Sequence, residues 1–217
     1  MVKPLKRWLL VSGLVSAALF ALAGTWRDPW LWAYVIVWSA ATSYALFSID
    51  EDLARERFHP PTQGADAVAL HVVRVVALSH LVVGALDSGR WHIAPVSPAL
   101  RGFALAGMAL TFGMFFRAMR ENRFFSSVVR VQDDRGHRVI DSGPYSIVRH
   151  PGYAGLMVGM PFSGLALGSW LAAAIGLVMS AMILRRVTFE DAFLQKNLDG
   201  YVAYTHRVRH RLIPGVW

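Results

Sequence analysis

An apolar run from residue 152 to residue 184 sets the first limit on how this chain can fold. An α-helix rises 1.5 Å per residue, so about 20 residues cross a bilayer and this run is too long for one crossing. Gly168, Ser169 and Trp170 divide it into halves of about 16 and about 14 residues, each slightly short of a full span. The run therefore predicts a helical hairpin, and Pro161 predicts a kink in its first arm.

Four further apolar segments precede the hairpin, and each has the length of a membrane helix. The chain is 55% hydrophobic and only 17% charged, whereas a soluble domain carries about 25% charged residues. We therefore expect an all-α, polytopic transmembrane protein of five to six membrane helices, the last two forming the hairpin. Residues 21–23 read Ala-Leu-Ala, like a signal-peptidase site, but the preceding run is long for a signal peptide and a retained helix is expected. The four segments run from Trp8 to Gly24, Trp30 to Ile49, Ala67 to Leu86 and Leu100 to Phe116.

Lysine and arginine residues are distributed unevenly about these helices. With six crossings, 18 of the 22 basic residues fall on one side, three fall on the other, and Arg74 lies within a helix. The positive-inside rule assigns the richer side and both termini to the cytoplasm, so we expect a multi-pass protein of the cytoplasmic membrane. The basic residues that give the net charge of +8 lie beside the apolar runs, which indicates membrane lipid rather than nucleic acid as a partner.

Two polar segments are expected at the cytoplasmic surface. The loop from Asp50 to Asp66 contains the helix-breaking pair Pro60-Pro61. Between Ala118 and His150, two strand-like stretches at 128–131 and 138–140 flank residues 133–137, which read Asp-Asp-Arg-Gly-His. That arrangement predicts a small β-hairpin. We divide the chain accordingly into N-terminal transmembrane helices at 1–121 and a C-terminal region at 122–217, made of the surface loop, the helical hairpin and a cytoplasmic tail.

The first cluster of candidate functional residues runs from Gly143 to Gly155. Pro151 suits the first position of the hairpin helix. Arg149 and His150 would then stand at a helix N-terminus, where an anion such as a ligand carboxylate can bind. A membrane-boundary turn with an ordinary cytoplasmic arginine is an equally good interpretation of the same residues.

The second cluster ends the second arm of the hairpin, where Arg186 and Glu190 are four residues apart and share one helix face. Glu190 and Asp191 place two carboxylates near a membrane boundary, which is costly unless they are paired or used. They suit a sulfonium, an amine or ribose hydroxyls, although a solvated ion pair explains them equally well. A third cluster, residues 201–217, is basic and aromatic, and by itself it predicts an interfacial anchor.

His71, Arg74 and His80 fall within the third apolar segment. Ionisable groups inside a membrane are functional candidates, and Arg74 could meet either the negative group of an acceptor or a structural partner. The roles of these three residues stay open. Their spacing suggests no metal site. The chain has no cysteine, which excludes disulfides and a cysteine nucleophile.

Taken in order, these motifs resemble one known family. Gly-Pro-Tyr at 143–145, Arg-His-Pro-x-Tyr at 149–153, the apolar hairpin, Arg-x-x-x-Glu-Asp at 186–191, Tyr-x-x-Tyr at 201–204 and Arg-Leu-Ile-Pro-Gly at 211–215 are similar to the isoprenylcysteine carboxyl methyltransferase family. The same architecture is similar to that of phospholipid N-methyltransferases and, more distantly, to that of sterol reductases. The resemblance covers about Asn122 to Trp217. It implies an integral membrane methyltransferase that binds S-adenosylmethionine at its cytoplasmic side and methylates a lipidic or small apolar acceptor.

The resemblance also implies a role for each matching residue. Arg186 would orient the acceptor, and His150 or Glu190 would take a proton from a thiol or amine acceptor, so these three are the expected catalytic residues. Asp191 stands where the family usually has a second glutamate, and its shorter reach puts its role in question. The cofactor pocket would be lined by Tyr145, Arg149, His150, Pro151, Tyr153, Gly155, Glu190, Asp191, Tyr201 and Tyr204.

Alternatives remain for both the acceptor and the function. The acceptor is an isoprenylcysteine carboxylate, an aminophospholipid or a small thiol. An NADPH-dependent membrane reductase is possible, with Arg117, Arg120 and Arg123 binding phosphate, and so is a non-catalytic scaffold or transport subunit. The internal repeats common in transporters are not evident. The methyltransferase hypothesis requires the two ends of the hairpin to converge, so that His150 lies close to Glu190 across a shared cavity.

Overall fold

The computed structural model describes residues 2–59, 67–93 and 95–217, and in that part of the chain all regular structure beyond one isolated bridge is helical. The all-α fold predicted from the sequence is confirmed to this extent. The helices are α1 (Val2–Ala23), α2 (Pro29–Ser48), α3 (Glu51–Phe58), α4 (Ala67–Leu86), the π-helical turn η1 (Asp87–Trp91), α5 (Pro98–Glu121), the 3-10 turns η2 (Asp133–Arg135) and η3 (Gly143–Ser146), α6 (Pro151–Leu167), α7 (Trp170–Asn197) and α8 (Tyr201–Arg207).

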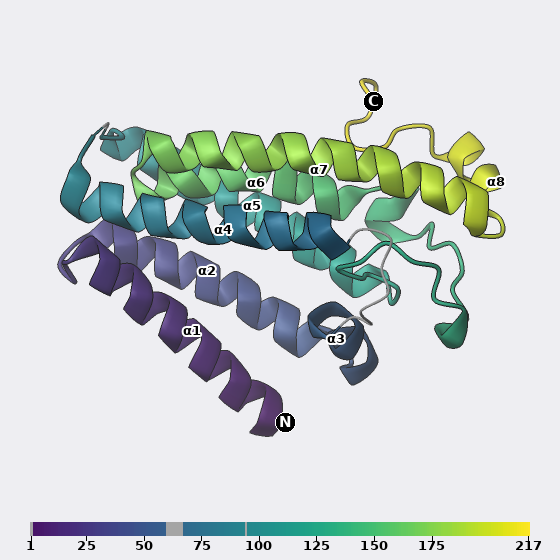
Figure 1. The fold of residues 1–217 in the computed structure, drawn as a ribbon, viewed down its shortest axis with the longest axis horizontal. Helices are drawn as coiled ribbons and strands as arrows, with labels where there is room; N and C mark the ends of the chain where they lie inside the picture. The colour runs from purple at the N-terminus through teal and green to yellow at the C-terminus, as the bar shows by residue number, and fades with distance from the viewer. Residues whose placement is uncertain (1, 60–66, 94) are drawn as a thin grey trace.

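The long helices form one elongated bundle (Figure 1). α4, α5, α6 and α7 run alongside one another, with the most extensive contacts between α5 and α6 and between α6 and α7. α1 and α2 lie on one side of this group, and α1 diverges from it towards the N-terminus. The α1–α2 and α6–α7 turns share one end of the bundle. α3, the segment between α5 and α6, and α8 gather at the other end, which is where the candidate site lies.

The apolar character of the helices suits a lipid environment. Among the described residues, three helices are long and apolar enough to cross a membrane, Leu70–Trp91, Pro98–Glu121 and Trp170–Asn197, and Trp8–Ala23 is a shorter apolar helix. Large apolar side chains such as Leu110 and Leu177 are 76% and 62% exposed on the bundle surface. An exposed apolar surface of this kind marks a protein that meets lipid or another apolar partner.

The predicted helical hairpin is present, and it turns where the sequence indicates. α6 ends at Leu167, and the φ of 90° at the following Gly168 is the left-handed conformation that glycine favours. Ser169 then caps α7, because its Oγ accepts the Ala172 N–H at 3.0 Å. α7 is longer than the apolar run predicts and continues to Asn197. Arg186, Glu190 and Asp191 therefore belong to one unbroken helix.

Pro161 lies inside α6, where it cannot donate a hydrogen bond to the Met157 carbonyl four residues earlier. Ser180 of α7 provides a donor in its place, since its Oγ lies 2.6 Å from the Met157 carbonyl oxygen and 2.9 Å from that of Gly176. A neighbouring helix thus satisfies the carbonyl that proline leaves free, as apolar surroundings require. The helix continues past Pro161 to Leu167, and the kink expected there stays a prediction.

The β-hairpin predicted for residues 128–140 is wrong. In the described structure this stretch contains no strand and belongs to an irregular loop, residues 122–142, that we call the α5–α6 loop. Hydrogen bonds to side chains stabilise this loop, where a β-hairpin would use hydrogen bonds between two strands. Gln132 donates from Nε2 to the Phe124 carbonyl at 2.8 Å, and its backbone N–H donates to His137 Nδ1 at 3.2 Å. The segment that begins at Asp50 forms α3, and Pro60-Pro61 lie outside the described residues.

Candidate functional site

The start of α6, the end of α7 and the C-terminal segment meet at the carboxylate of Asp191, which is fully buried. Arg149 binds this carboxylate with both donors of its fork, Nε to Oδ1 at 2.8 Å and Nη2 to Oδ2 at 3.0 Å. Arg211 Nε reaches Oδ2 at 2.9 Å, and His150 Nε2 lies 3.2 Å from Oδ1. Two guanidinium groups and further donors on one carboxylate are the condition under which a buried charge is tolerated.

The contacts of Arg149, His150 and Arg211 with Asp191 form what we call the clamp. Backbone hydrogen bonds extend this clamp along the C-terminal segment. The N–H groups of Arg149 and His150 donate to the carbonyl oxygens of His210 and Arg211 at 3.0 and 2.9 Å. Arg149 Nη1 donates to the carbonyl oxygens of Val208 and Arg209, at 2.8 Å each. The basic C-terminal tail is therefore built into this end of the fold. The sequence alone favoured a simple membrane anchor there.

A second polar group lies beside the clamp and joins α6 to α7 through a tyrosine. Tyr153 donates its hydroxyl to Glu190 Oε2 at 2.7 Å, and Arg186 Nε donates to the same hydroxyl at 2.6 Å. Arg186 Nε lies 3.9 Å from Glu190 Oε2, and its Nη2 donates to the Ser127 carbonyl at 2.7 Å. In the described residues, no donor reaches Glu190 Oε1.

A cavity separates these groups from the α5–α6 loop. Tyr201 and Tyr204 of α8 and Tyr145 of η3 line one side of it. The Tyr204 hydroxyl donates to the Tyr145 carbonyl at 2.7 Å, and the Tyr201 hydroxyl donates to Asp191 Oδ1 at 3.1 Å. Burial raises the pKa of each of these three tyrosines, so they are neutral hydrogen-bond donors at ordinary pH.

The structure brings most of the predicted site residues to this cavity. Pro151 is buried as the first residue of α6, and Gly155 packs against α5, where an added Cβ would come within 2.6 Å of the Thr111 carbonyl oxygen. Asp191 is enclosed in the clamp and Arg186 lies behind Tyr153, so these four do not line the cavity. The predicted residues that do line it are Tyr145, Arg149, His150, Tyr153, Glu190, Tyr201 and Tyr204.

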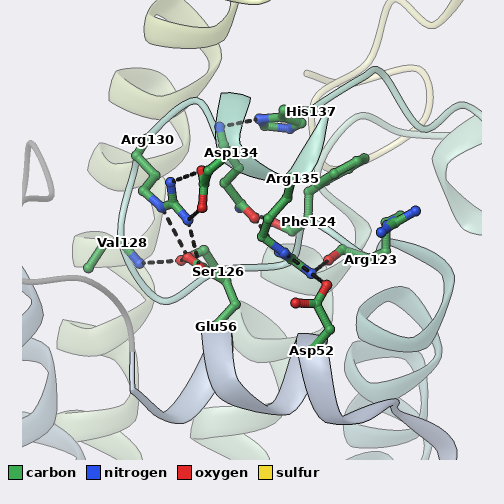
Figure 2. A network of polar contacts seen from close by, with 11 residues as sticks. Asp52, Glu56, Arg123, Phe124, Ser126, Val128, Arg130, Asp134, Arg135 and His137 are labelled. Carbon is green, nitrogen blue, oxygen red and sulfur yellow. Dashed lines mark hydrogen bonds and ion pairs between the residues drawn. The ribbon is translucent and has the colours of Figure 1, made fainter.

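The wall opposite α7 consists of the α5–α6 loop, and α3 holds this loop in place (Figure 2). Glu56 Oε2 pairs with Arg130 Nη2 at 2.8 Å, and Glu56 Oε1 accepts the Ser126 hydroxyl at 2.6 Å. Asp52 pairs with Arg135, whose Nε lies 3.0 Å from Oδ2. Sequence reasoning missed this wall, and it missed Arg57, which lines the cavity from α3. The only available signal was the local excess of charge in residues 50–57.

The ionisable residues of α4 lie away from the cavity wall. His80 is fully buried, with Nδ1 2.9 Å from the Ala172 carbonyl oxygen and Nε2 3.0 Å from Ser163 Oγ, which in turn lies 2.9 Å from the Tyr34 hydroxyl. His80 thus joins three helices through satisfied hydrogen bonds. His71 and Arg74 are exposed on the bundle surface. No group of three or more potential metal ligands occurs among residues 2–59, 67–93 and 95–217.

Comparison with known proteins agrees with the class that the helical fold and this site define, a membrane methyltransferase. Residues 102–196 match the model of the isoprenylcysteine carboxyl methyltransferase (ICMT) family. Through this region the chain is similar to that family. Neither the reductase nor the non-catalytic alternative is favoured by these matches.

The chain is similar to three named relatives. Protein-S-isoprenylcysteine O-methyltransferase B of Arabidopsis thaliana is 24% identical over 159 residues, which cover 65% of this chain and 81% of that protein. Protein-S-isoprenylcysteine O-methyltransferase of Schizosaccharomyces pombe is 27% identical over 104 residues, 46% of this chain and 44% of that protein. A probable protein-S-isoprenylcysteine O-methyltransferase of Oryza sativa subsp. indica is 31% identical over 92 residues, 42% of this chain and 48% of that protein. The matches to the last two cover less than half of their lengths.

Proposed function

We propose that this protein transfers a methyl group from S-adenosylmethionine to the carboxylate of an S-prenylated cysteine, and that the transfer takes place in the cavity between α3, the α5–α6 loop, α7 and α8. The observation that supports this most strongly is the convergence of the two ends of the hairpin. His150, at the start of α6, and Glu190, near the end of α7, line the same cavity. The names of the relatives suggest the acceptor, because each is called an isoprenylcysteine O-methyltransferase.

The chemistry of the lining fits the proposed donor. Glu190 is the one carboxylate that lines the cavity among the described residues, and none of those residues donates to its Oε1. It would accept hydrogen bonds from ribose hydroxyls or lie near the sulfonium charge, while the tyrosine rings offer apolar faces to the base. Asp191 is already bound by Arg149 and Arg211. Its expected contribution is therefore to hold the C-terminal segment over the site.

The donor carries an already activated methyl group, so the protein needs no covalent intermediate. A carboxylate acceptor has no proton to lose, and the proposed reaction therefore uses neither His150 nor Glu190 as a base. The residues of the chain contribute position, which can account for roughly 7–11 kcal/mol of a reaction barrier. Arg186 does not line the cavity, so it would orient the acceptor through the Tyr153 hydroxyl, to which its Nε donates at 2.6 Å.

The proposed site faces the cytoplasm. Most basic residues of the chain, 18 of 22, belong to the segments at this end, and that excess supports the assignment through the positive-inside rule. The prenyl group of the acceptor would reach the cavity from the lipid, because apolar chains partition there. Amine and thiol acceptors would need a base, and no observed contact favours them over a carboxylate.

The proposal is tested with purified protein in detergent. Calorimetry should show binding of S-adenosylhomocysteine, and a radiolabelled donor should transfer its methyl group to an N-acylated S-prenylcysteine. Loss of the negative charge in Glu190→Gln should weaken binding by about 10- to 100-fold, the usual effect of losing a charge-assisted hydrogen bond. Glu51→Gln, on the exposed side of α3, serves as the matched control. Folded wild-type protein that binds no S-adenosylhomocysteine at millimolar concentration would refute the assignment.

A further inference from the structure

We propose that Arg57 of α3 binds the carboxylate of the methyl acceptor and thereby selects acids over their neutral analogues. This inference rests on the proposed function and assigns a residue from outside the matched C-terminal motifs. Arg57 is half-buried and lines the cavity. It precedes the family match, which begins at residue 102, by 45 positions, so no motif in that match points to it.

The contacts that hold the guanidinium of Arg57 among the described residues include no ion pair. It lies over the rings of Phe115 and Phe125, with its central carbon 5.7 and 5.3 Å from their centroids. Its Nη1 donates to the Ser126 carbonyl at 3.3 Å. Across the described part of the chain, no carboxylate comes within ion-pair distance of Arg57. A guanidinium has five N–H donors, so most of them are available to a ligand.

The charges around Arg57 favour an incoming anion. Arg74 and Arg186 are near enough to repel its charge, whereas Glu190 and Tyr153 favour it. Glu190 already receives the Tyr153 hydroxyl and lies 3.9 Å from Arg186. Burial lowers the pKa of Arg57 below its ordinary value, because desolvation opposes the charged form. The attraction of a bound carboxylate would offset both the repulsion and the free-energy cost of desolvation.

The position of Arg57 is supported by the contacts that other residues of its helix make. Asp50 caps α3 by accepting the Leu53 N–H at 2.7 Å, and Leu53 is buried. Asp52 and Glu56 are four residues apart and are both paired with arginines of the α5–α6 loop (Figure 2). The acidic face of α3 therefore holds the loop, while Arg57 faces the cavity that this loop covers.

The surroundings of Arg57 suit the acceptor better than the donor. Phe115, near the end of α5, and Leu156, in the second turn of α6, line the cavity on the side of the apolar bundle. A prenyl chain can follow these side chains while its carboxylate meets Arg57. Two arginines line the cavity from the α5–α6 loop. Arg130 is already paired with Glu56 and Asp134, so Arg138 is better placed for the carboxylate of the donor.

The contact is compatible with the proposed reaction. One carboxylate oxygen forms the new C–O bond to the methyl carbon while the S–CH₃ bond breaks and its electron pair stays on sulfur. The products are a neutral methyl ester and a neutral thioether, and no proton moves. Arg57 would hold the other carboxylate oxygen, which leaves the first free to attack. After transfer the ester has no charge, so its affinity for Arg57 falls and the product can leave.

The experiment compares Arg57→Met and Arg57→Lys with Arg55→Met, an exposed arginine two residues earlier on the same helix. We expect Arg57→Met to raise the KM for the prenylcysteine acid by about 10- to 100-fold, and Arg57→Lys to raise it less. The Kd for S-adenosylhomocysteine should stay within about twofold of wild type, and Arg55→Met should leave both values unchanged. In the wild type, the acid should compete with the methyl acceptor more strongly than its carboxamide does, and Arg57→Met should abolish this preference.

Three outcomes would overturn the inference. An unchanged acceptor KM in Arg57→Met would show that Arg57 binds no substrate, and a weakened S-adenosylhomocysteine Kd with unchanged acceptor KM would assign it to the donor. If Arg57→Met fails to fold, the wild-type protein still tests the inference. Equal competition of the acid and the carboxamide with the methyl acceptor would then contradict it. Wild-type protein without donor binding or methyl transfer would instead refute the proposed function, so the two failures are distinguishable.

Discussion

At Asp191, side chains from three segments of the chain meet one carboxylate that solvent does not reach. The sequence presents Glu190 and Asp191 as a pair, but adjacent positions on a helix point about 100° apart. Glu190 therefore lines the cavity while Asp191 faces the clamp. The shorter aspartate, which raised doubt when judged against the family pattern, accepts the fork of Arg149 at 2.8 and 3.0 Å.

The clamp predicts that Asp191→Asn is strongly destabilising. The substitution leaves the buried guanidinium of Arg149 without its carboxylate, and breaking one partner of a buried ion pair costs about 3–5 kcal/mol. Denaturant unfolding in detergent should show this loss, while Asp199→Asn in the exposed turn before α8 should stay within about 0.5 kcal/mol of wild type. Similar stability for the two variants would mean that the clamp does not hold this end of the fold.

Among the elements, the helices are the part that sequence predicts well. Runs of apolar residues mark α1, α2, α4, α5 and the hairpin, because a backbone in lipid must satisfy its own hydrogen bonds. The extension of α7 from residue 184 to Asn197 gives no such signal, since charged and polar residues interrupt its apolar ones. The α5–α6 loop misled the prediction for a related reason. Its conformation depends on α3, which lies 70 residues or more away in the chain, as the Glu56–Arg130 and Asp52–Arg135 pairs show.

The residues of the candidate site also fall into those that the sequence predicts and those that it does not. Motif residues such as Tyr145, His150 and Glu190 could be found from the sequence, because their types and order resemble a family. Arg57 and the loop residues could not, because nothing in their local pattern says which segments fold together. The sequence shows that Pro161 leaves a carbonyl without its helical donor. It does not show that Ser180 provides a donor to this Met157 carbonyl at 2.6 Å.

The α5–α6 loop should open on mild acidification. Burial lowers the pKa of His137 to about 4, and its Nδ1 accepts the Gln132 N–H, which only the unprotonated ring can do. The unfolded loop takes up this proton near pH 6.5. Between these two pKa values the unfolded form binds more protons. The stability from neutral His137 is therefore complete above about pH 6.5 and is lost as the pH falls towards 4.

Hydrogen exchange at pH 7 and pH 5, corrected for the intrinsic pH dependence of amide exchange, tests this expectation. Residues 130–139 should lose protection at pH 5 in the wild type, whereas α6 should not. His137→Asn cannot be protonated and should remove the difference between the two pH values. Equal protection of the wild-type loop at both pH values, or a pH response that survives in His137→Asn, would contradict the role assigned to His137.

On the scale of the whole molecule, the bundle separates two environments. Leucine and valine side chains are exposed along the long helices. Most ion pairs of the described residues join residues of α3, the α5–α6 loop, α7 and the C-terminal segment. α3 connects the two sequence halves at that end, because its acidic face binds the loop and its Arg57 reaches the cavity. The N-terminal half, which lies outside the motifs that carry the family resemblance, thus contributes to the site.

Hydrogen exchange with and without saturating S-adenosylhomocysteine tests most directly whether this cavity is the donor site. Slower exchange is expected in residues 122–155 and 187–212, which surround the cavity, and none in α1 or α2, which lie away from it. Bound ligand, verified by calorimetry, that left both of those regions unprotected would show that the donor binds elsewhere and would contradict the proposed site.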